Sequence, residues 1–190
     1  SSDLIVLAGN SRFHIRDGNI QSGHFVCIQP HAHTFCGAKY ACFPYSVYTG
    51  NILLPENAPD GNNHAQKQCI AVSEDGINFT KFEKNPVIDI PNDHPIIANI
   101  DFRDPKIWKH DGKYYCAIGN RIHDRSRTQI VLFESENFFD WKFKSVAAIS
   151  KPDYSEGTMW ECPGFAHFGD KYVMIISPQH VPPKGHLFHN

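Results

Sequence analysis

The chain has 190 residues, enough for one domain with a substantial hydrophobic core. Lysines and arginines number 18 against 20 aspartates and glutamates, so no basic surface favours nucleic acid as a partner. No apolar run reaches the roughly 18 residues of a membrane-spanning helix, which argues against a membrane partner. Thirteen prolines, thirteen glycines and 13% aromatic residues indicate many turns and short strands rather than long helices.

The cysteines and histidines bear on compartment and metal binding. Six cysteines show no Cys-x-x-Cys spacing, which predicts free, mostly buried thiols in a reducing compartment and hence a cytoplasmic protein: Cys27, Cys36, Cys42, Cys69, Cys116 and Cys162. Ser1 to Gly9 lack the basic leader of a signal peptide, and secretion is the alternative if a leader precedes them. His31 and His33 have no companion at a metal-site spacing, so we expect neither a metal nor a cofactor.

Residues 1–47 show only short apolar runs, which predict weak strands at 24–28 and 40–48. The pattern becomes more regular from Tyr48 onward. It predicts strands at Gln68–Ser73, Asn78–Glu83, Pro105–His110, Lys113–Gly119, Arg127–Glu134, Trp141–Ile149, Gly164–Phe168 and Tyr172–Ser177. We expect loops at residues 85–98, at 151–159 and in the tail from Pro178. No helix is predicted, because the apolar residues nowhere keep a 3.6-residue period over three turns.

Two segments of the chain repeat one pattern. Residues 104–115 and 162–173 both contain a proline, an apolar strand, a turn of glycine and aspartate, a Lys-Tyr pair and the start of a second apolar strand; the prolines lie 58 residues apart. Asp111-Gly112 is typical of a two-residue hairpin turn. With the strands that follow, each unit has four antiparallel strands, as in the blade of a β-propeller. The sequence therefore predicts an all-β propeller.

The repeat also brings polar residues together. The residues before each proline open the innermost strand of a blade, so Arg103-Asp104 and Glu161-Cys162 should face one central funnel. Two converging carboxylates are the equipment for glycoside hydrolysis. Trp160 and Cys162 should give Glu161 apolar surroundings, which raise a carboxyl pKa as a general acid requires. The alternatives are a strand-edge glutamate beside a packed tryptophan, and a structural Arg103–Asp104 ion pair.

Several motifs resemble those of glycoside hydrolase family 32, the group of invertases, fructanases and sucrose-6-phosphate hydrolases. The segment Asp101 to Trp108 resembles the family's RDP motif, and Trp160-Glu161-Cys162-Pro163 resembles its WECP motif. Residues 48–51, 68–76, 85–88 and 177–179 also resemble family landmarks, in the family's order. The resemblance divides the chain into a poorly matched segment, 1–47, and a partial propeller catalytic domain, 48–190.

The resemblance implies a five-bladed propeller with a funnel-shaped site and a retaining mechanism. By correspondence, Glu161 is the catalytic acid/base and Asp104 the transition-state stabiliser. Arg103, Trp160 and Cys162 are the implied substrate-binding residues, with Arg103 orienting and charge-tuning the carboxylates. The implied partner is a small carbohydrate, sucrose or sucrose 6-phosphate, whose β-fructofuranosyl bond is hydrolysed without a metal.

The family's nucleophile motif is missing from the chain. The family nucleophile lies in an N-terminal Asn-Asp-Pro-Asn-Gly sequence, and Asp17, after Arg12-Phe13-His14-Ile15, is the only candidate for its place besides the misplaced Asn92-Asp93. The chain length fits about two to three and a half blades, so we expect a fragment of a longer β-fructofuranosidase. The alternatives are a fructosyltransferase on the same site and a catalytically incomplete propeller that at most binds sugar.

Overall fold

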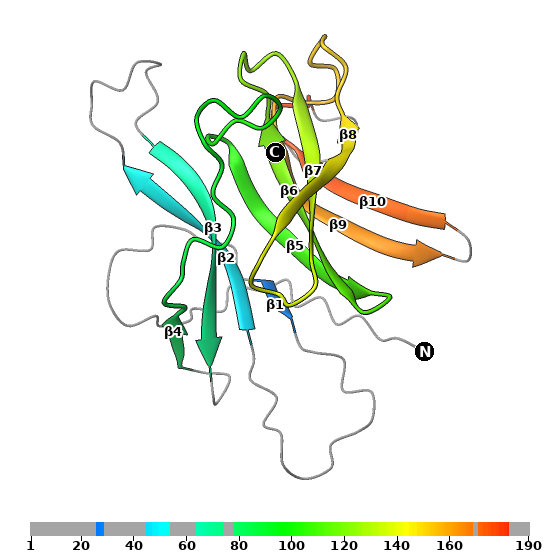
Figure 1. Ribbon diagram of the computed structural model, residues 1–190. Coiled ribbons are helices and arrows are strands. Elements are labelled where there is room, and N and C mark those ends of the chain that lie inside the picture. The colour runs from blue at the N-terminus through cyan, green and yellow to red at the C-terminus, as the bar shows by residue number, and fades with distance from the viewer. Residues whose placement is uncertain (1–25, 29–44, 54–63, 74–77, 169–170, 183–190) are drawn as a thin grey trace.

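The computed structural model describes residues 26–28, 45–53, 64–73, 78–168 and 171–182, which form ten β-strands and no helix (Figure 1). The strands are β1 (Val26–Ile28), β2 (Tyr45–Leu53), β3 (His64–Ser73), β4 (Phe79–Lys81), β5 (Phe102–His110), β6 (Lys113–Arg121), β7 (Thr128–Ser135), β8 (Lys142–Ile149), β9 (Trp160–Phe168) and β10 (Lys171–Pro178). They build three antiparallel sheets, with the orders β1-β2-β3-β4, β5-β6-β7-β8 and β9-β10. The predicted all-β class is confirmed.

Each sheet consists of strands that follow one another in the chain, and neighbouring strands pair antiparallel. The predicted turn between β5 and β6 is present: His110 pairs with Lys113 across Asp111 and Gly112. The φ angles of these two turn residues are 46° and 80°. Two successive left-handed residues make the turn that matches the twist of a hairpin, which explains the choice of aspartate and glycine.

Some strand boundaries differ from the prediction. β2 extends to Leu53 rather than ending at 48, and β4 is limited to Phe79–Lys81. β5 and β9 each begin three residues before their proline, at Phe102 and Trp160. Residues 24–25, 40–44 and the turn at 169–170 lie outside the described residues, but β9 and β10 pair as the predicted hairpin.

β5 and β9 share an irregularity at the proline. In each strand, the proline and the residue before it oppose only one residue of the partner strand, which is a β-bulge. The residue before the proline has a positive φ in both cases, 62° at Asp104 and 48° at Cys162. A proline fits at a bulge because it has no N–H group to donate to the strand ladder. The sequence repeat is thus a structural repeat, down to the backbone conformation of single residues.

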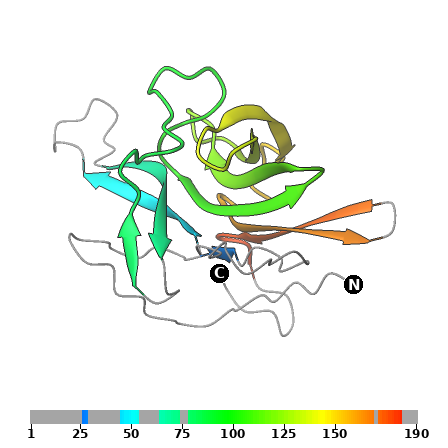
Figure 2. The same cartoon turned by 60° about the horizontal axis from the view of Figure 1, so that its bottom comes forward.

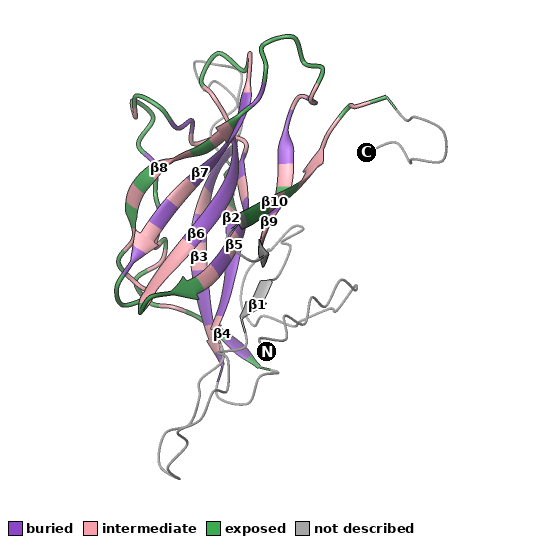
Figure 3. Ribbon diagram, turned by 90° about the vertical axis from the view of Figure 1, so that its right-hand side faces the viewer, coloured by how far each residue is buried: buried purple, intermediate pink, exposed green. Residues whose placement is uncertain are grey.

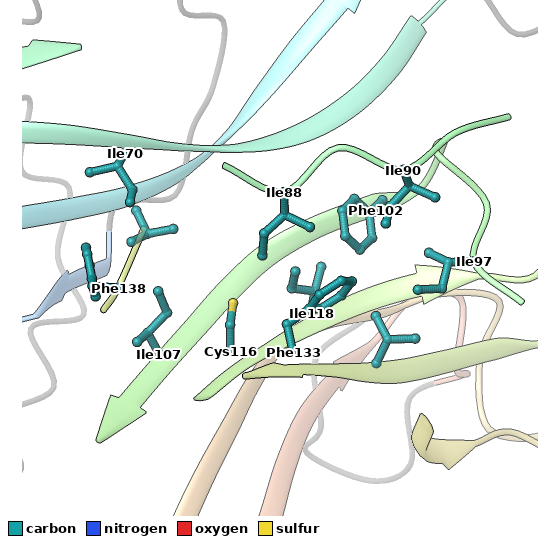
Figure 4. Packing of buried hydrophobic residues seen from close by; sticks show 12 residues of the cluster. Ile70, Ile88, Ile90, Ile97, Phe102, Ile107, Cys116, Ile118, Phe133 and Phe138 are labelled. Carbon is teal, nitrogen blue, oxygen red and sulfur yellow. The ribbon is translucent and has the colours of Figure 1, made fainter. Parts of the chain in front are cut away.

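The sheets pack face to face, with the β5–β8 sheet between the other two (Figures 1 and 2). β6 is buried on both faces: Cys116 and Ile118 face the β1–β4 sheet, and Ala117 faces β9 and β10. Buried residues run along the middle of the stacked sheets (Figure 3). The largest cluster fills the space between the first two sheets, as Figure 4 shows: Val47, Ile70, Ile88, Ile90, Ile97, Phe102, Ile107, Cys116, Ile118, Val131, Phe133 and Phe138.

The first strands of the three sheets lie next to one another. β5 contacts both β1 and β9, although these strands are far apart in the chain. Stacked four-stranded sheets whose first strands gather on the inside are the blades of a β-propeller. The described residues supply two four-stranded blades and the first two strands of a third. This part of a propeller lies within the predicted range.

Gly119 of β6 marks a close approach between the second and third sheets. A Cβ atom added there would collide with the backbone oxygen of Trp160. Because a strand backbone cannot move aside as a flexible side chain can, we expect Gly119→Ala to lower the free energy of unfolding by roughly 1–3 kcal/mol.

Gly164→Ala is the matched control for this substitution. Its Cβ atom would lie 3.8 Å from the Cβ of Ile175, an ordinary contact. Urea denaturation of the two variants and the unchanged protein measures the difference. Equal midpoints for the two variants would contradict the tight packing of β6 against β9.

Candidate active site

Two contacts join the beginnings of β5 and β9. Arg103 Nε donates a hydrogen bond of 2.9 Å to Glu161 Oε1, and the Cys162 amide donates one of 3.1 Å to Asp104 Oδ2. Arg103 and Glu161 hold the same position relative to the proline of their strands, as do Asp104 and Cys162. The structure therefore brings four of the predicted site residues together, each bonded to its counterpart on the neighbouring blade.

Arg103 is the cation of this site. Its Nη1 lies 2.7 Å from Asp101 Oδ1, so the guanidinium bridges two carboxylates. Only 18% of its side chain is exposed. Burial alone would lower the pKa of Arg103, but the hydrogen bonds and charges of Asp101 and Glu161 outweigh burial and raise the pKa. Arg103 therefore stays charged and holds both carboxylates in place.

Asp101 is a site residue to which the sequence prediction assigned no role. Its carboxylate lies between two arginines, 2.7 Å from Arg103 Nη1 and 3.7 Å from Arg121 Nη1. Its φ is 47°, and its carbonyl oxygen accepts hydrogen bonds from the Arg121 amide and the Asn120 side chain. Its place two residues before Arg103 is the signal in the sequence, because a carboxylate so close in the chain can reach the guanidinium.

Asp104 is buried, with 8% of its surface exposed. Besides the Cys162 amide, its Oδ2 has the Cys162 thiol at 3.7 Å. Its own amide donates a hydrogen bond of 3.2 Å to Thr49 Oγ1 of β2. Arg103 pairs with Asp101 and Glu161 rather than with Asp104, so the alternative of a local Arg103–Asp104 ion pair is not what the structure shows.

Glu161 and Trp160 lie on opposite sides of β9, because side chains alternate along a strand. Trp160 is 6% exposed and packs with Ala117 and Ile130 between the sheets, while its Nε1 donates to the Glu156 carbonyl. The expected apolar surroundings of Glu161 are therefore wrong: 22% of its side chain is exposed and its partner is a cation. The substrate-binding role of Trp160 stays a prediction, and Asp17 lies outside the described residues.

Cys69, Cys116 and Cys162 are free thiols. Cys116 is buried as expected, whereas Cys162 is exposed. Partial burial of the Cys162 sulfur and the negative charges of Asp104 and Glu161 raise the pKa of its thiol to about 11. Cys162 is thus a neutral thiol beside two carboxylates at ordinary pH.

The described residues also bear on metal sites, membrane-spanning helices and cavities. They contain no group of three or more side chains placed to hold a metal ion. That part of the chain also has no helix with the length and hydrophobicity needed to cross a membrane. A cavity of ≈ 470 Å³ lies near the ends of β2 and β3 and shares no residue with the carboxylate site; it is lined by Ile52, Ala65, Lys67, Asp89, Ile90, Pro91, Asn92 and Asn99.

The chain forms part of a β-propeller in which carboxylates and an arginine meet where two inner strands begin, an arrangement that resembles the carboxylate sites of glycoside hydrolases. The comparison with protein families agrees with this resemblance. Residues 9–189 match the model described as the glycosyl hydrolases family 32 N-terminal domain. The chain therefore belongs to glycoside hydrolase family 32.

Three members of the family resemble the chain over part of their length. It is 35% identical over 150 residues to a sucrose-6-phosphate hydrolase of Bacillus subtilis, covering 77% of this chain, and 36% identical over 145 residues to a raffinose invertase of Escherichia coli, covering 76%. The chain spans 28% of the length of each. A Bombyx mori GH32 beta-fructofuranosidase mutant in complex with sucrose matches 75% of this chain and 28% of its own, with a TM-score of 0.63 and 36% identity.

The raised pKa of Cys162 predicts slow alkylation. At about pH 8, a shift from 9.0 to about 11 lowers the thiolate fraction roughly 100-fold, and the greater nucleophilicity of the more basic thiolate recovers about tenfold. We therefore expect iodoacetamide to modify Cys162 roughly ten times more slowly than a free cysteine, with a rate that keeps rising as the pH approaches 11.

Peptide mass spectrometry measures this rate at Cys162 alone, since the chain has other thiols. The Asp104→Asn variant provides the comparison, because removing the negative charge beside the sulfur should lower the pKa of Cys162 and speed the reaction. A rate that is already half-maximal near pH 9 in the unchanged protein would contradict the description of this site.

Proposed function

We propose that this chain carries the acid/base part of a β-fructofuranosidase site, which hydrolyses sucrose or sucrose 6-phosphate with retention. The observation that carries the proposal is the pair of contacts between β5 and β9, Arg103 to Glu161 and Cys162 to Asp104. They hold one partly exposed and one buried carboxylate on neighbouring inner strands. Membership of family 32 supports the reaction class, and the sucrose-bound relative supports the substrate class.

Glu161 is proposed as the acid/base. Among the described residues, its carboxylate accepts a hydrogen bond through Oε1, from Arg103. As an acid it donates a proton to the oxygen of the leaving glucosyl group. As a carboxylate it then accepts a proton from the water that releases the fructosyl unit.

Asp104 is proposed to stabilise the transition state. Charge on the fructosyl ring becomes positive as the glycosidic bond breaks, and a fixed negative charge nearby lowers the energy of that state. The Cys162 amide and the bulge hold Asp104 in one orientation, so no reorganisation is needed during the reaction. Asp17 remains our candidate for the nucleophile, which attacks the anomeric carbon in a retaining mechanism.

The purified chain tests this proposal directly through fructose release from sucrose. We expect Glu161→Gln to lower kcat by about 10²- to 10⁴-fold, because a glutamine keeps the shape of the side chain but cannot exchange a proton. Glu136→Gln is the matched control, because Glu136 has 83% of its side chain exposed and lies away from the site. Full turnover by the Glu161 variant would sink the assignment.

The second substitution separates catalysis from folding. We expect Asp104→Asn to lower kcat by about 10²-fold or more, because the fixed charge disappears. The melting temperature should change little, since the asparagine oxygen can still accept the Cys162 amide. Asp111→Asn, in the exposed turn between β5 and β6, is the control. A large fall in melting temperature with unchanged turnover per folded molecule would show that the role of Asp104 is structural.

The products distinguish the alternatives. Equal amounts of glucose and fructose indicate hydrolysis, whereas oligofructans at high sucrose indicate fructosyl transfer. Sucrose binding without turnover at any pH would favour the incomplete propeller. A comparison of kcat/KM for sucrose and sucrose 6-phosphate decides which of the two is the better substrate.

A further inference from the structure

A buried chain of polar side chains links the first blade to the beginning of β5. Gln66 and Gln68 of β3 bond the two backbone groups of Phe102: the Phe102 amide donates to Gln66 Oε1 at 2.7 Å, and Gln68 Nε2 donates to the Phe102 carbonyl at 2.8 Å. Gln66 is 6% exposed and Gln68 fully buried. β5 is an edge strand of its sheet, so on the side away from β6 the glutamines take the place of a neighbouring strand.

Thr49 of β2 continues this chain to Asp104. Its hydroxyl donates to Gln68 Oε1 at 2.9 Å and accepts from the Asp104 amide at 3.2 Å. Thr49 is 7% exposed. If its hydroxyl were lost, water could not readily replace it as the partner of the Gln68 side chain or of the Asp104 amide. A hydroxyl can donate and accept at once, which no apolar side chain of the same shape can do.

Asp104 is therefore anchored on two sides. Thr49 of the first blade holds its amide, and the Cys162 amide of the third blade holds its carboxylate. Its φ of 62° is uncommon for a residue with a side chain and needs its surroundings to maintain it. The hydrogen bond from the Asp104 amide to Thr49 lies at the bulge, where the regular pairing of β5 with β6 is interrupted. Loss of the Thr49 hydroxyl removes one of the two anchors that set the direction of the Asp104 side chain.

We infer that Thr49 is a positioning residue for Asp104, acting through the backbone of β5 rather than on the substrate. The inference rests on the proposed function insofar as it concerns turnover. Its geometric part, that the Thr49 hydroxyl maintains the orientation of Asp104, stands independently of catalysis.

Thr49→Val and Thr49→Ser form the test pair. Valine keeps the shape of threonine and loses the hydroxyl, whereas serine keeps the hydroxyl and loses a methyl group. With sucrose as substrate, and turnover expressed per folded molecule, we expect Thr49→Val to lower kcat at least about tenfold with KM changed less than about twofold. Thr49→Ser should recover most of kcat. Thr80→Val, the same change at an exposed position of β4, is the control.

Backbone amide exchange measured by NMR tests the geometry without any turnover. In Thr49→Val the amides of Asp104 and Cys162 should exchange with solvent at least about tenfold faster, and in Thr49→Ser they should stay protected. Unchanged exchange at both amides, unchanged kcat per folded molecule, or equal impairment of both variants would overturn the inference. If the unchanged chain releases no fructose, the proposed activity of the chain fails, and amide exchange alone decides the role of Thr49.

Discussion

The bond between Arg103 and Glu161 is the interaction on which the site depends. Three acidic side chains, Asp101, Asp104 and Glu161, lie where two inner strands begin, and mutual repulsion would separate them without a cation. Arg103 bridges two of them and is itself four-fifths shielded from solvent. The third, Asp104, is held by a backbone amide instead. Ionic and neutral hydrogen bonds together allow acidic groups to gather at the contact between two blades.

The bulges give these contacts their geometry. In a regular strand, Asp104 of β5 and Cys162 of β9 would each pair with the neighbouring strand, and each side chain would lie on the face opposite to that of the residue before it. The extra residue and the left-handed φ at both positions redirect them, so that the amide of one strand meets the carboxylate of the other. Such a backbone persists only when its surroundings maintain it. Here those surroundings come from three sheets: Thr49 from the first, β5 from the second and β9 from the third.

Much of the fold could be predicted because its signals are local. The Asp111-Gly112 turn requires two left-handed residues, and the repeated proline marks the bulge of each inner strand. The site was predicted only in part. Arg103, Asp104, Glu161 and Cys162 are brought together by the blade repeat, but Asp101 was assigned no role. The surroundings of Glu161 were wrong, because its neighbour Trp160 points into the space between the sheets.

By itself, the sequence determined the antiparallel strands, their hairpin turns and the equivalence of the two proline segments, because each depends on residues close together in the chain. Only the tertiary structure decided which charged groups pair. The partner of Glu161 is 58 residues away, and that of the Asp104 amide is 55 residues away on another sheet. Residues adjacent in a strand point to opposite faces of the sheet. Burial and charge pairing therefore follow from the packing of the blades rather than from adjacency in the chain.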